Sequence, residues 1–161
     1  MSTVRVALAG SSGSIGAQTL DVVRAEQGRY EVVALGVGSS IETLIAQAHE
    51  FRPKVVAVAD ERRRQEVAAA VPFADVVGDL ADLAEDADVV VNGVVGFAGL
   101  PVTVRTLELG KRLALANKES LIAGAPVVQP LRSTPGAELV PVDSEHCAVH
   151  QCLRASADAR R

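Results

Sequence analysis

A glycine-rich turn near the start of the chain restricts its fold more than any other feature. The apolar run Val4–Ala9 leads into Gly10-Ser11-Ser12-Gly13-Ser14-Ile15-Gly16, and an apolar pattern of helical period follows. Glycine permits a tight turn between a strand and a helix, and it lets a ligand approach the backbone closely. Backbone N–H groups at the start of the helix then favour an anion. The turn therefore predicts a pyrophosphate site, although a turn that merely packs tightly has the same spacing.

Short apolar runs rich in valine alternate with segments of helical spacing along the chain. Such runs indicate strands buried on both faces, and the alternation predicts a parallel sheet with right-handed crossovers. The expected fold class is α/β, a Rossmann-like, doubly wound, mainly parallel sheet with helices on both faces. Ligands of such sheets bind at the carboxyl ends of the strands. The expected strands are residues 4–9, 31–37, 54–58, 89–91, 112–116 and 138–142.

Composition and charge argue against several classes of protein. A chain of 161 residues suffices for one domain, and 48% apolar against 22% charged residues argue against disorder. The formal net charge of −4 gives no bias toward polyanions, so nucleic acid is not an expected partner. No run approaches the roughly 20 apolar residues of a membrane helix, so a membrane is not expected either. Cys147 and Cys152 lie close together without a signal-like leader, which makes the cytoplasm the expected compartment.

The second expected strand ends in Gly38-Ser39-Ser40, without a carboxylate. An acid at this position would repel a ribose 2′-phosphate, whereas serine hydroxyls and backbone amides can accept one. The sequence therefore favours NADP over NAD, although no Arg or Lys stands in this loop. The same residues are also typical of a helix N-cap before Ile41, with Glu42 in the first turn.

A cluster of four polar residues, Asn117-Lys118-Glu119-Ser120, follows the expected strand 112–116. At the carboxyl edge of the sheet, Asn117 could bond to a nicotinamide or ribose group, and Lys118 could orient an anionic or hydroxylated substrate. The alternative is that Asn117 caps the next helix, with Glu119 and Ser120 in its first turn. The spacing does not separate these two interpretations.

The last expected strand runs into Asp143-Ser144-Glu145-His146. Two carboxylates two residues apart lie on the same side of an extended backbone and could begin a site for magnesium or manganese. An octahedral ion needs further oxygen ligands, so the pair is incomplete. On spacing alone, Asp143 or Ser144 is better interpreted as the cap of a helix that begins near Glu145. The histidines and cysteines from His146 to Cys152 match no familiar zinc framework.

Three stretches together resemble the amino-terminal part of the 1-deoxy-D-xylulose 5-phosphate reductoisomerase family. They are Gly-Ser-Ser-Gly-Ser-Ile-Gly (10–16), Leu-Ala-Asn-Lys-Glu-Ser-Leu (115–121) and Pro-Val-Asp-Ser-Glu-His (141–146). The resemblance covers essentially the whole chain. It implies an NADPH-dependent step of the non-mevalonate isoprenoid pathway, in which a rearrangement to an aldehyde and a hydride transfer give 2-C-methyl-D-erythritol 4-phosphate. It also implies a phosphosugar substrate, a divalent metal (Mg²⁺ or Mn²⁺) and, for full-length members, a homodimer.

The resemblance implies roles for individual residues of this chain. Asp143 and Glu145 are the implied metal ligands, and Lys118, Ser144 and Glu145 are the implied catalytic residues near the substrate. The implied NADPH-binding residues are Gly10, Ser12, Gly13, Ser14, Ile15, Gly38, Asn117 and Glu119. Some positions depart from the family pattern. Ser39 and Ser40 replace a basic residue that is common after Gly38, Cys147 stands where asparagine is common, and Phe97 stands where a small residue is usual.

The resemblance also suggests how the chain divides. Residues 1–140 are expected to form an NADP-binding Rossmann-like domain, and residues 141–161 the truncated start of the metal and substrate domain. Full members of the family continue with a further metal-binding glutamate and the phosphate-binding residues. We therefore expect the isolated 161-residue chain to be catalytically inactive, since hydride transfer requires an aligned substrate. Two alternatives are a stand-alone NADPH-binding module and one half of a split enzyme.

Overall fold

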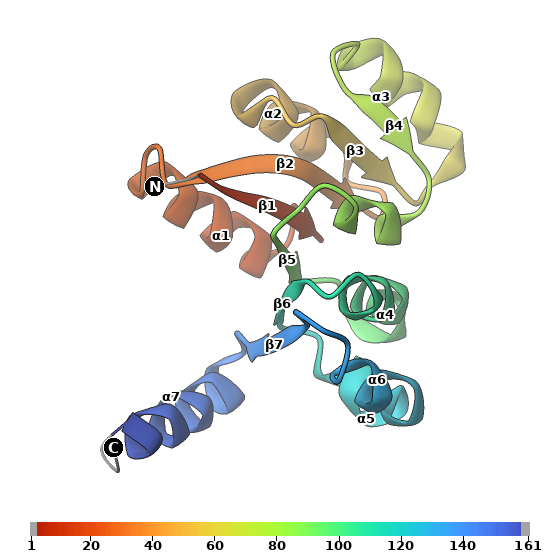
Figure 1. Ribbon diagram of the computed structural model, residues 1–161. Helices are drawn as coiled ribbons and strands as arrows, with labels where there is room; N and C mark the ends of the chain where they lie inside the picture. The colour runs from red at the N-terminus through yellow and green to blue at the C-terminus, as the bar shows by residue number, and fades with distance from the viewer. Residues whose placement is uncertain (1–2, 159–161) are drawn as a thin grey trace.

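The computed structural model describes residues 3–158, which form a seven-stranded sheet flanked by helices (Figure 1). The strand order is β4-β3-β2-β1-β5-β6-β7, and every strand pair in the described residues is parallel. The predicted doubly wound fold is therefore confirmed, with a fully parallel sheet. The strands are β1 (Val4–Ala9), β2 (Tyr30–Val37), β3 (Val55–Val58), β4 (Asp75–Val77), β5 (Val89–Asn92), β6 (Arg112–Leu115) and β7 (Glu138–Pro141).

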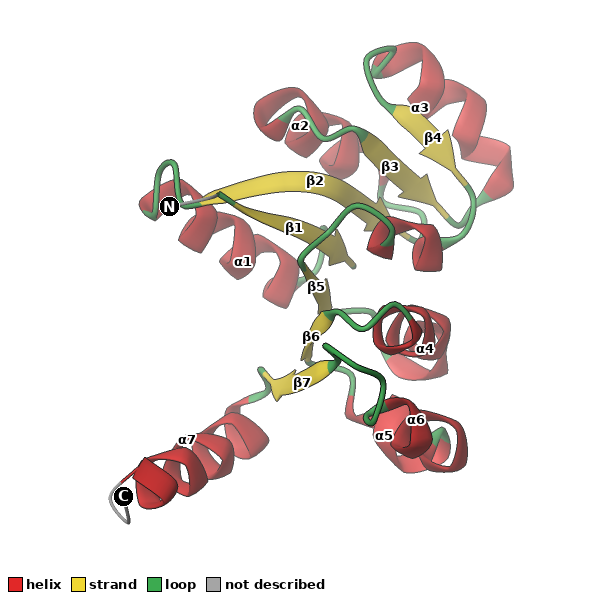
Figure 2. Ribbon diagram, in the orientation of Figure 1, coloured by secondary structure: helices red, strands yellow, loops and turns green. Residues whose placement is uncertain are grey.

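Helices lie on both faces of the sheet (Figure 2). The α-helices are α1 (Ser14–Ala25), α2 (Ile41–Phe51), α3 (Arg64–Ala70), α4 (Leu100–Glu108), α5 (Lys118–Ala123), α6 (Ala125–Leu131) and α7 (Ser144–Asp158), and short 3₁₀ helices occur at η1 (Glu61–Arg63), η2 (Leu80–Ala84) and η3 (Gly96–Gly99). Gly110, at φ +65°, follows α4 in the left-handed conformation that ends helices, as its sequence position predicts. Among the described residues, no helix combines the length and apolarity needed to cross a membrane.

The two faces of the sheet carry side chains of different size because successive strand residues point to opposite sides. On the face covered by α1, α2 and α3, Leu8 and Leu35 pack with helix residues such as Leu44. On the other face the central strands carry mostly small residues, among them Ala7 and Ala57, so that η2 and α4 can pack close to the backbone. A third apolar cluster joins α4 and α6 to the strands β6 and β7.

One strand lies outside the expected set. Strand β4 has three residues, pairs with β3 alone in the described sheet, and is exposed or half-buried throughout. Its short sequence, Asp75-Val76-Val77, shows neither a long apolar run nor a clear alternation. The other six strands agree with the predicted ranges to within one residue at each end. The sheet order places the reversal of strand connectivity between β1 and β5, where such folds bind ligands.

Candidate functional site

The glycine turn after β1 is held rigidly at the reversal point of the sheet. The N–H groups of Gly10 and Ser11 both donate to the carbonyl of Gly36, at 2.8 and 3.0 Å, which ties the turn to β2. Gly10 adopts φ +83°, and a Cβ there would lie 2.8 Å from the carbonyl carbon of Gly93 on the β5 side. Glycine is therefore required at this position by backbone conformation and by space.

The helix after this turn offers its first N–H groups to a ligand. Gly13 is the N-cap of α1, and within the described residues no side chain caps this end. Ser12, Gly13 and Ser14 are exposed, so an anion can reach the turn from solvent. The buried hydroxyl of Ser11 finds no hydrogen-bond partner among the described residues, which leaves a polar group available inside the turn. This arrangement fits the predicted pyrophosphate site.

A cavity of about 180 Å³ opens beside the turn, between the carboxyl ends of β5 and β6. Its lining includes Ile15, Asn117 and Glu119, three residues to which the family resemblance gives a role in cofactor binding. Gly93, Val94 and Val95 close the side toward β5. The structure thus brings residues from three separate loops to one hollow at the reversal point.

Asn117 is fully engaged in the fold. Its Oδ1 accepts from the backbone N–H of Ser120 at 2.8 Å and from the Ser120 hydroxyl at 2.7 Å, which caps α5. Its Nδ2 donates to the carbonyls of Val94 and Gly96 and so fixes the loop that lines the cavity. The capping alternative is therefore observed. A direct bond to the cofactor stays a prediction.

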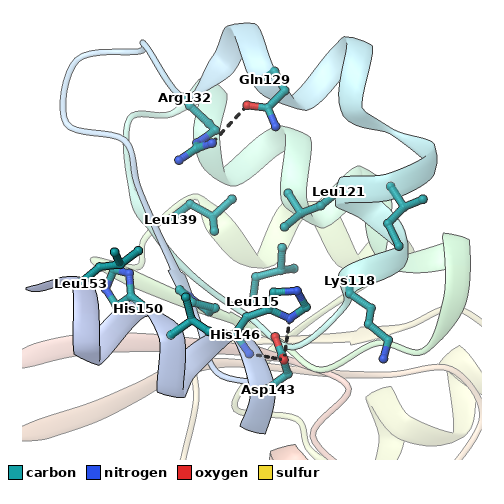
Figure 3. Close-up of a pocket in the computed structure, with 13 residues that line it drawn as sticks. Leu115, Lys118, Leu121, Gln129, Arg132, Leu139, Asp143, His146, His150 and Leu153 are labelled. Atoms are coloured by element: carbon teal, nitrogen blue, oxygen red, sulfur yellow. Dashed lines mark hydrogen bonds and ion pairs between the residues drawn. The ribbon is translucent and has the colours of Figure 1, made fainter.

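Lys118 lies at the boundary between this cavity and a larger one. The second cavity measures about 360 Å³ and is mostly apolar, and its lining also includes Asp143 and His146 (Figure 3). Lys118 and the adjacent Glu119 are exposed at the start of α5. One flexible cation thus borders both the cofactor side and the side that carries the predicted metal ligand.

Asp143 caps α7, as the spacing of the sequence favours. Its Oδ1 accepts from the backbone N–H of His146 at 3.0 Å and lies 2.7 Å from the His146 ring nitrogen Nδ1 (Figure 3). The bond from the His146 backbone N–H is the main reason why the pKa of Asp143 is lowered, so the carboxylate is charged at neutral pH.

The predicted metal site lacks a third protein ligand within the described residues. Residues 3–158 contain no group of three or more His, Cys, Asp and Glu side chains placed to hold a metal ion. Ser144 and Glu145 are exposed on the first turn of α7, and neither is among the described lining residues of the larger cavity. The donor set of Asp143 and Glu145 suits a hard cation, with further oxygens needed from outside the pair.

The turn after β2 keeps its hydroxyls exposed. Helix α2 begins at Ile41, yet the N-cap residue Ser40 makes no capping side-chain bond among the described residues. The pKa of Glu42 is lowered, chiefly by a bond from its own backbone N–H and then by Arg63. Gly38, Ser39 and Ser40 are all solvent-exposed at the carboxyl end of β2. The position of this turn suits the predicted contact between Gly38 and the cofactor.

Two buried amides support the site but were not predicted from the sequence. Asn92, at the end of β5, donates from Nδ2 to the carbonyl of Gly99 at 2.8 Å and to the Thr103 hydroxyl at 3.0 Å. Gln47, in α2, donates from Nε2 to the carbonyl of Ser11 at 2.9 Å and so supports the glycine turn. A polar residue on the apolar face of α2 is a signal that could have identified Gln47.

Comparison with known proteins decides the family. The family model described as 1-deoxy-D-xylulose 5-phosphate reductoisomerase matches residues 6–125. The chain belongs to this family. The reductoisomerase of Cyanothece sp. (strain PCC 7425) is 46% identical over 158 residues, and that of Thermosynechococcus vestitus is 48% identical over 156 residues. These alignments cover 92% and 91% of this chain but 41% and 38% of the relatives, so the chain spans about two fifths of their length.

Solved reductoisomerase structures share the fold. The Zymomonas mobilis enzyme, in complex with NADPH, superposes with a TM-score of 0.89 at 32% identity, covering 94% of this chain and 41% of that one. A second reductoisomerase, in complex with NADPH, fosmidomycin and magnesium, gives a TM-score of 0.88 at 35% identity, covering 92% and 38%. The predicted family resemblance is therefore confirmed over nearly the whole of this reductoisomerase-family chain.

Proposed function

We propose that this chain provides the NADPH-binding part and two metal-binding carboxylates of a 1-deoxy-D-xylulose 5-phosphate reductoisomerase. The reaction is the NADPH-dependent conversion of that phosphosugar to 2-C-methyl-D-erythritol 4-phosphate. The observation that carries the proposal is the position of Lys118 at the border of both cavities, with the glycine turn and Asn117 on one side and Asp143 on the other. Solved relatives with NADPH or with magnesium support the choice of cofactors.

The proposed role of the glycine turn is to hold the pyrophosphate. The uncapped N–H groups of α1 bind the anion, and the exposed backbone of Gly13 lets it come close. Gly10, Ser12, Ser14 and Ile15 complete the cradle, while Asn117 and Glu119 border the cavity beyond it. NADPH, when bound, supplies the hydride. The protein groups hold it at the sheet edge and exclude water from one side of it.

The proposed role of the second half of the site is to hold the substrate. Asp143 and Glu145 are the proposed metal ligands, and a bound magnesium or manganese ion would polarise substrate oxygens. Ser144 is proposed to contact the substrate, and Lys118 to place a positive charge beside it. We further propose that residues 1–140 and 141–161 belong to separate functional units, that the working enzyme is a homodimer, and that it is cytoplasmic. The free thiols of Cys147 and Cys152 support a reducing compartment.

NADPH binding by the 161-residue chain tests the cofactor half of the proposal. We expect a calorimetric binding signal that falls by about tenfold or more in affinity with Gly13→Ala, because the added Cβ occupies the approach of the pyrophosphate. In the fold itself this Cβ would meet only the Gly10 carbonyl oxygen, at 3.4 Å, so the thermal unfolding midpoint should not change. A chain that folds but binds no NADPH would contradict the proposed function.

Manganese binding tests the metal half. Asp143→Asn keeps an N-cap acceptor but removes the charge, so Mn²⁺ affinity measured by electron paramagnetic resonance should fall by about tenfold with little change in stability. The matched control is Asp79→Asn, because Asp79 also caps a short helix, through a bond from Ala81 N–H at 2.9 Å. Equal effects of the two variants, or none, would exclude Asp143 as a ligand.

A further inference from the structure

The turn after β2 lacks the positive charge that recognition of a ribose 2′-phosphate usually needs. Gly38-Ser39-Ser40 contains no acid to repel this group, yet it contains no Lys or Arg to bind it. Two hydroxyls and the start of α2 supply hydrogen-bond donors, but an arginine would add a bidentate, charge-assisted contact. If the chain binds NADPH, as proposed above, the positive charge that contacts the 2′-phosphate has to come from a neighbouring loop.

The neighbouring loop is the one that follows β3. The N–H of Ala59, just after β3, donates to the carbonyl of Val37, the last residue of β2, at 3.2 Å. The N–H of Asp60 donates to the carbonyl of Gly38 at 3.0 Å. These bonds hold the two loops side by side past the edge of the sheet. After Glu61 come three consecutive arginines, Arg62, Arg63 and Arg64.

The three arginines have different partners. Arg62 is bound by both carboxylate oxygens of Asp60, at 3.0 Å each, and Asp60 also caps η1. Arg64 donates from Nε to the carbonyl of Val58 at 3.0 Å, and its guanidinium lies where a side chain on Gly78 would stand. Both of these guanidinium groups therefore bond to residues at the end of β3 or in the loop that follows it.

Arg63 instead reaches across to α2. Its NH2 nitrogen donates to Oε1 of Glu42 at 2.9 Å, and Glu42 stands in the first turn of α2, two residues after Ser40. Its Nε also donates to Glu66, at 2.9 Å, in the adjoining helix α3. The Arg63 side chain is 35% exposed and that of Glu42 is 78% exposed. Glu42 therefore holds the arginine at the helix terminus with a solvent-exposed carboxylate that a stronger anion can displace.

We propose that Arg63, together with the Ser39 and Ser40 hydroxyls, binds the 2′-phosphate of NADPH, which takes the place of the Glu42 carboxylate. The inference rests on the proposed function and adds the residue that selects NADPH over NADH. The phosphate dianion brings more negative charge and more acceptor oxygens to the guanidinium than the carboxylate does. Glu66 remains as the second partner that orients Arg63.

Calorimetric affinities for NADPH and NADH, measured on the 161-residue chain and its variants, test the inference. Arg63→Gln should weaken NADPH binding by about tenfold and leave NADH nearly unchanged, since the lost contact is with the 2′-phosphate alone. Glu42→Gln should have the opposite effect, a several-fold gain for NADPH, because it frees the arginine and removes a competing charge. Arg29→Gln is the matched control, an exposed arginine in an ion pair with Glu26 at the other end of β2.

The outcomes separate the two proposals. The inference is supported if Arg63→Gln no longer prefers NADPH over NADH and Glu42→Gln prefers NADPH more strongly than the wild type does. An unchanged ratio of the two affinities in Arg63→Gln, or an equal loss for both cofactors, overturns the inference while the proposed function stands. Absence of binding by the folded wild-type chain to either cofactor overturns the proposed function, and the inference with it.

Discussion

Gly16→Ala is expected to lower the free energy of unfolding by about 2 to 3 kcal/mol, although Gly16 lies within a helix where alanine is normally the better residue. A Cβ at this position would lie 2.4 Å from the carbonyl oxygen of Ser11 and 2.5 Å from that of Gly10. Both atoms belong to the backbone of the glycine turn, which is bonded to β2 and cannot move without losing those bonds. Strain should therefore outweigh the gain in helix propensity.

Urea unfolding followed by circular dichroism measures this loss, and Gly13→Ala in the same turn is the control. Gly13 has φ −81°, a conformation open to any residue, and its Cβ would make only one ordinary contact. We expect Gly13→Ala to be close to the wild type in stability and Gly16→Ala to be far below it. Equal stabilities would show that the glycine turn relaxes around an added methyl group. The interpretation of this turn as rigid would then be wrong.

Asn117→Asp is expected to destabilise the fold by about 3 kcal/mol, because it places a buried carboxylate against two carbonyl oxygens. Asn117 is only 2% exposed. The aspartate keeps the acceptor that caps α5 but loses the Nδ2 donor that holds Val94 and Gly96. The loop lining the smaller cavity should loosen as a result, and NADPH binding should weaken together with stability.

Comparing the stability and NADPH affinity of Asn117→Asp with those of Lys118→Gln shows whether Asn117 supports the fold or contacts the cofactor directly. Lys118 is the next residue and is exposed, so its replacement should change the free energy of unfolding by less than about 0.5 kcal/mol. Stability of both variants is measured by urea unfolding, and cofactor affinity by calorimetry. If Asn117→Asp weakened NADPH binding without loss of stability, Asn117 would be a direct cofactor contact and the structural interpretation of its bonds would be wrong.

The order and type of most elements could be predicted from the sequence. Buried parallel strands need apolar residues on both faces, so the valine-rich runs identify six strands, and the glycine turn identifies the first helix. The edge strand β4 could not be predicted in this way, because a short strand with one neighbour needs few apolar residues. Whether the sheet is mainly or wholly parallel depends on its edge strands β4 and β7, whose parallel pairing with β3 and β6 only the structure shows.

The sequence predicted individual residues of the candidate site but not the hydrogen bonds that join them. The rule that ligands bind at the carboxyl ends of parallel strands brings Ile15, Asn117 and Glu119 to one edge without any coordinates. The sequence left open whether Asn117 caps a helix and favoured Asp143 or Ser144 as the cap of the last one. The structure shows that Asn117 and Asp143 both cap helices. The bond from Arg63 to Glu42 joins two residues that are 21 positions apart in the sequence, which no local pattern indicates.

Lys118 has a consequence that concerns the order of binding events. An exposed lysine side chain has many rotamers, and a ligand that fixes it bears the associated loss of entropy. Because this side chain borders both cavities, a ligand that orders it from one side leaves less disorder to be removed by a ligand arriving on the other. We therefore expect binding on the two sides to be cooperative, and the factor by which the first ligand helps the second must then equal the factor by which the second helps the first.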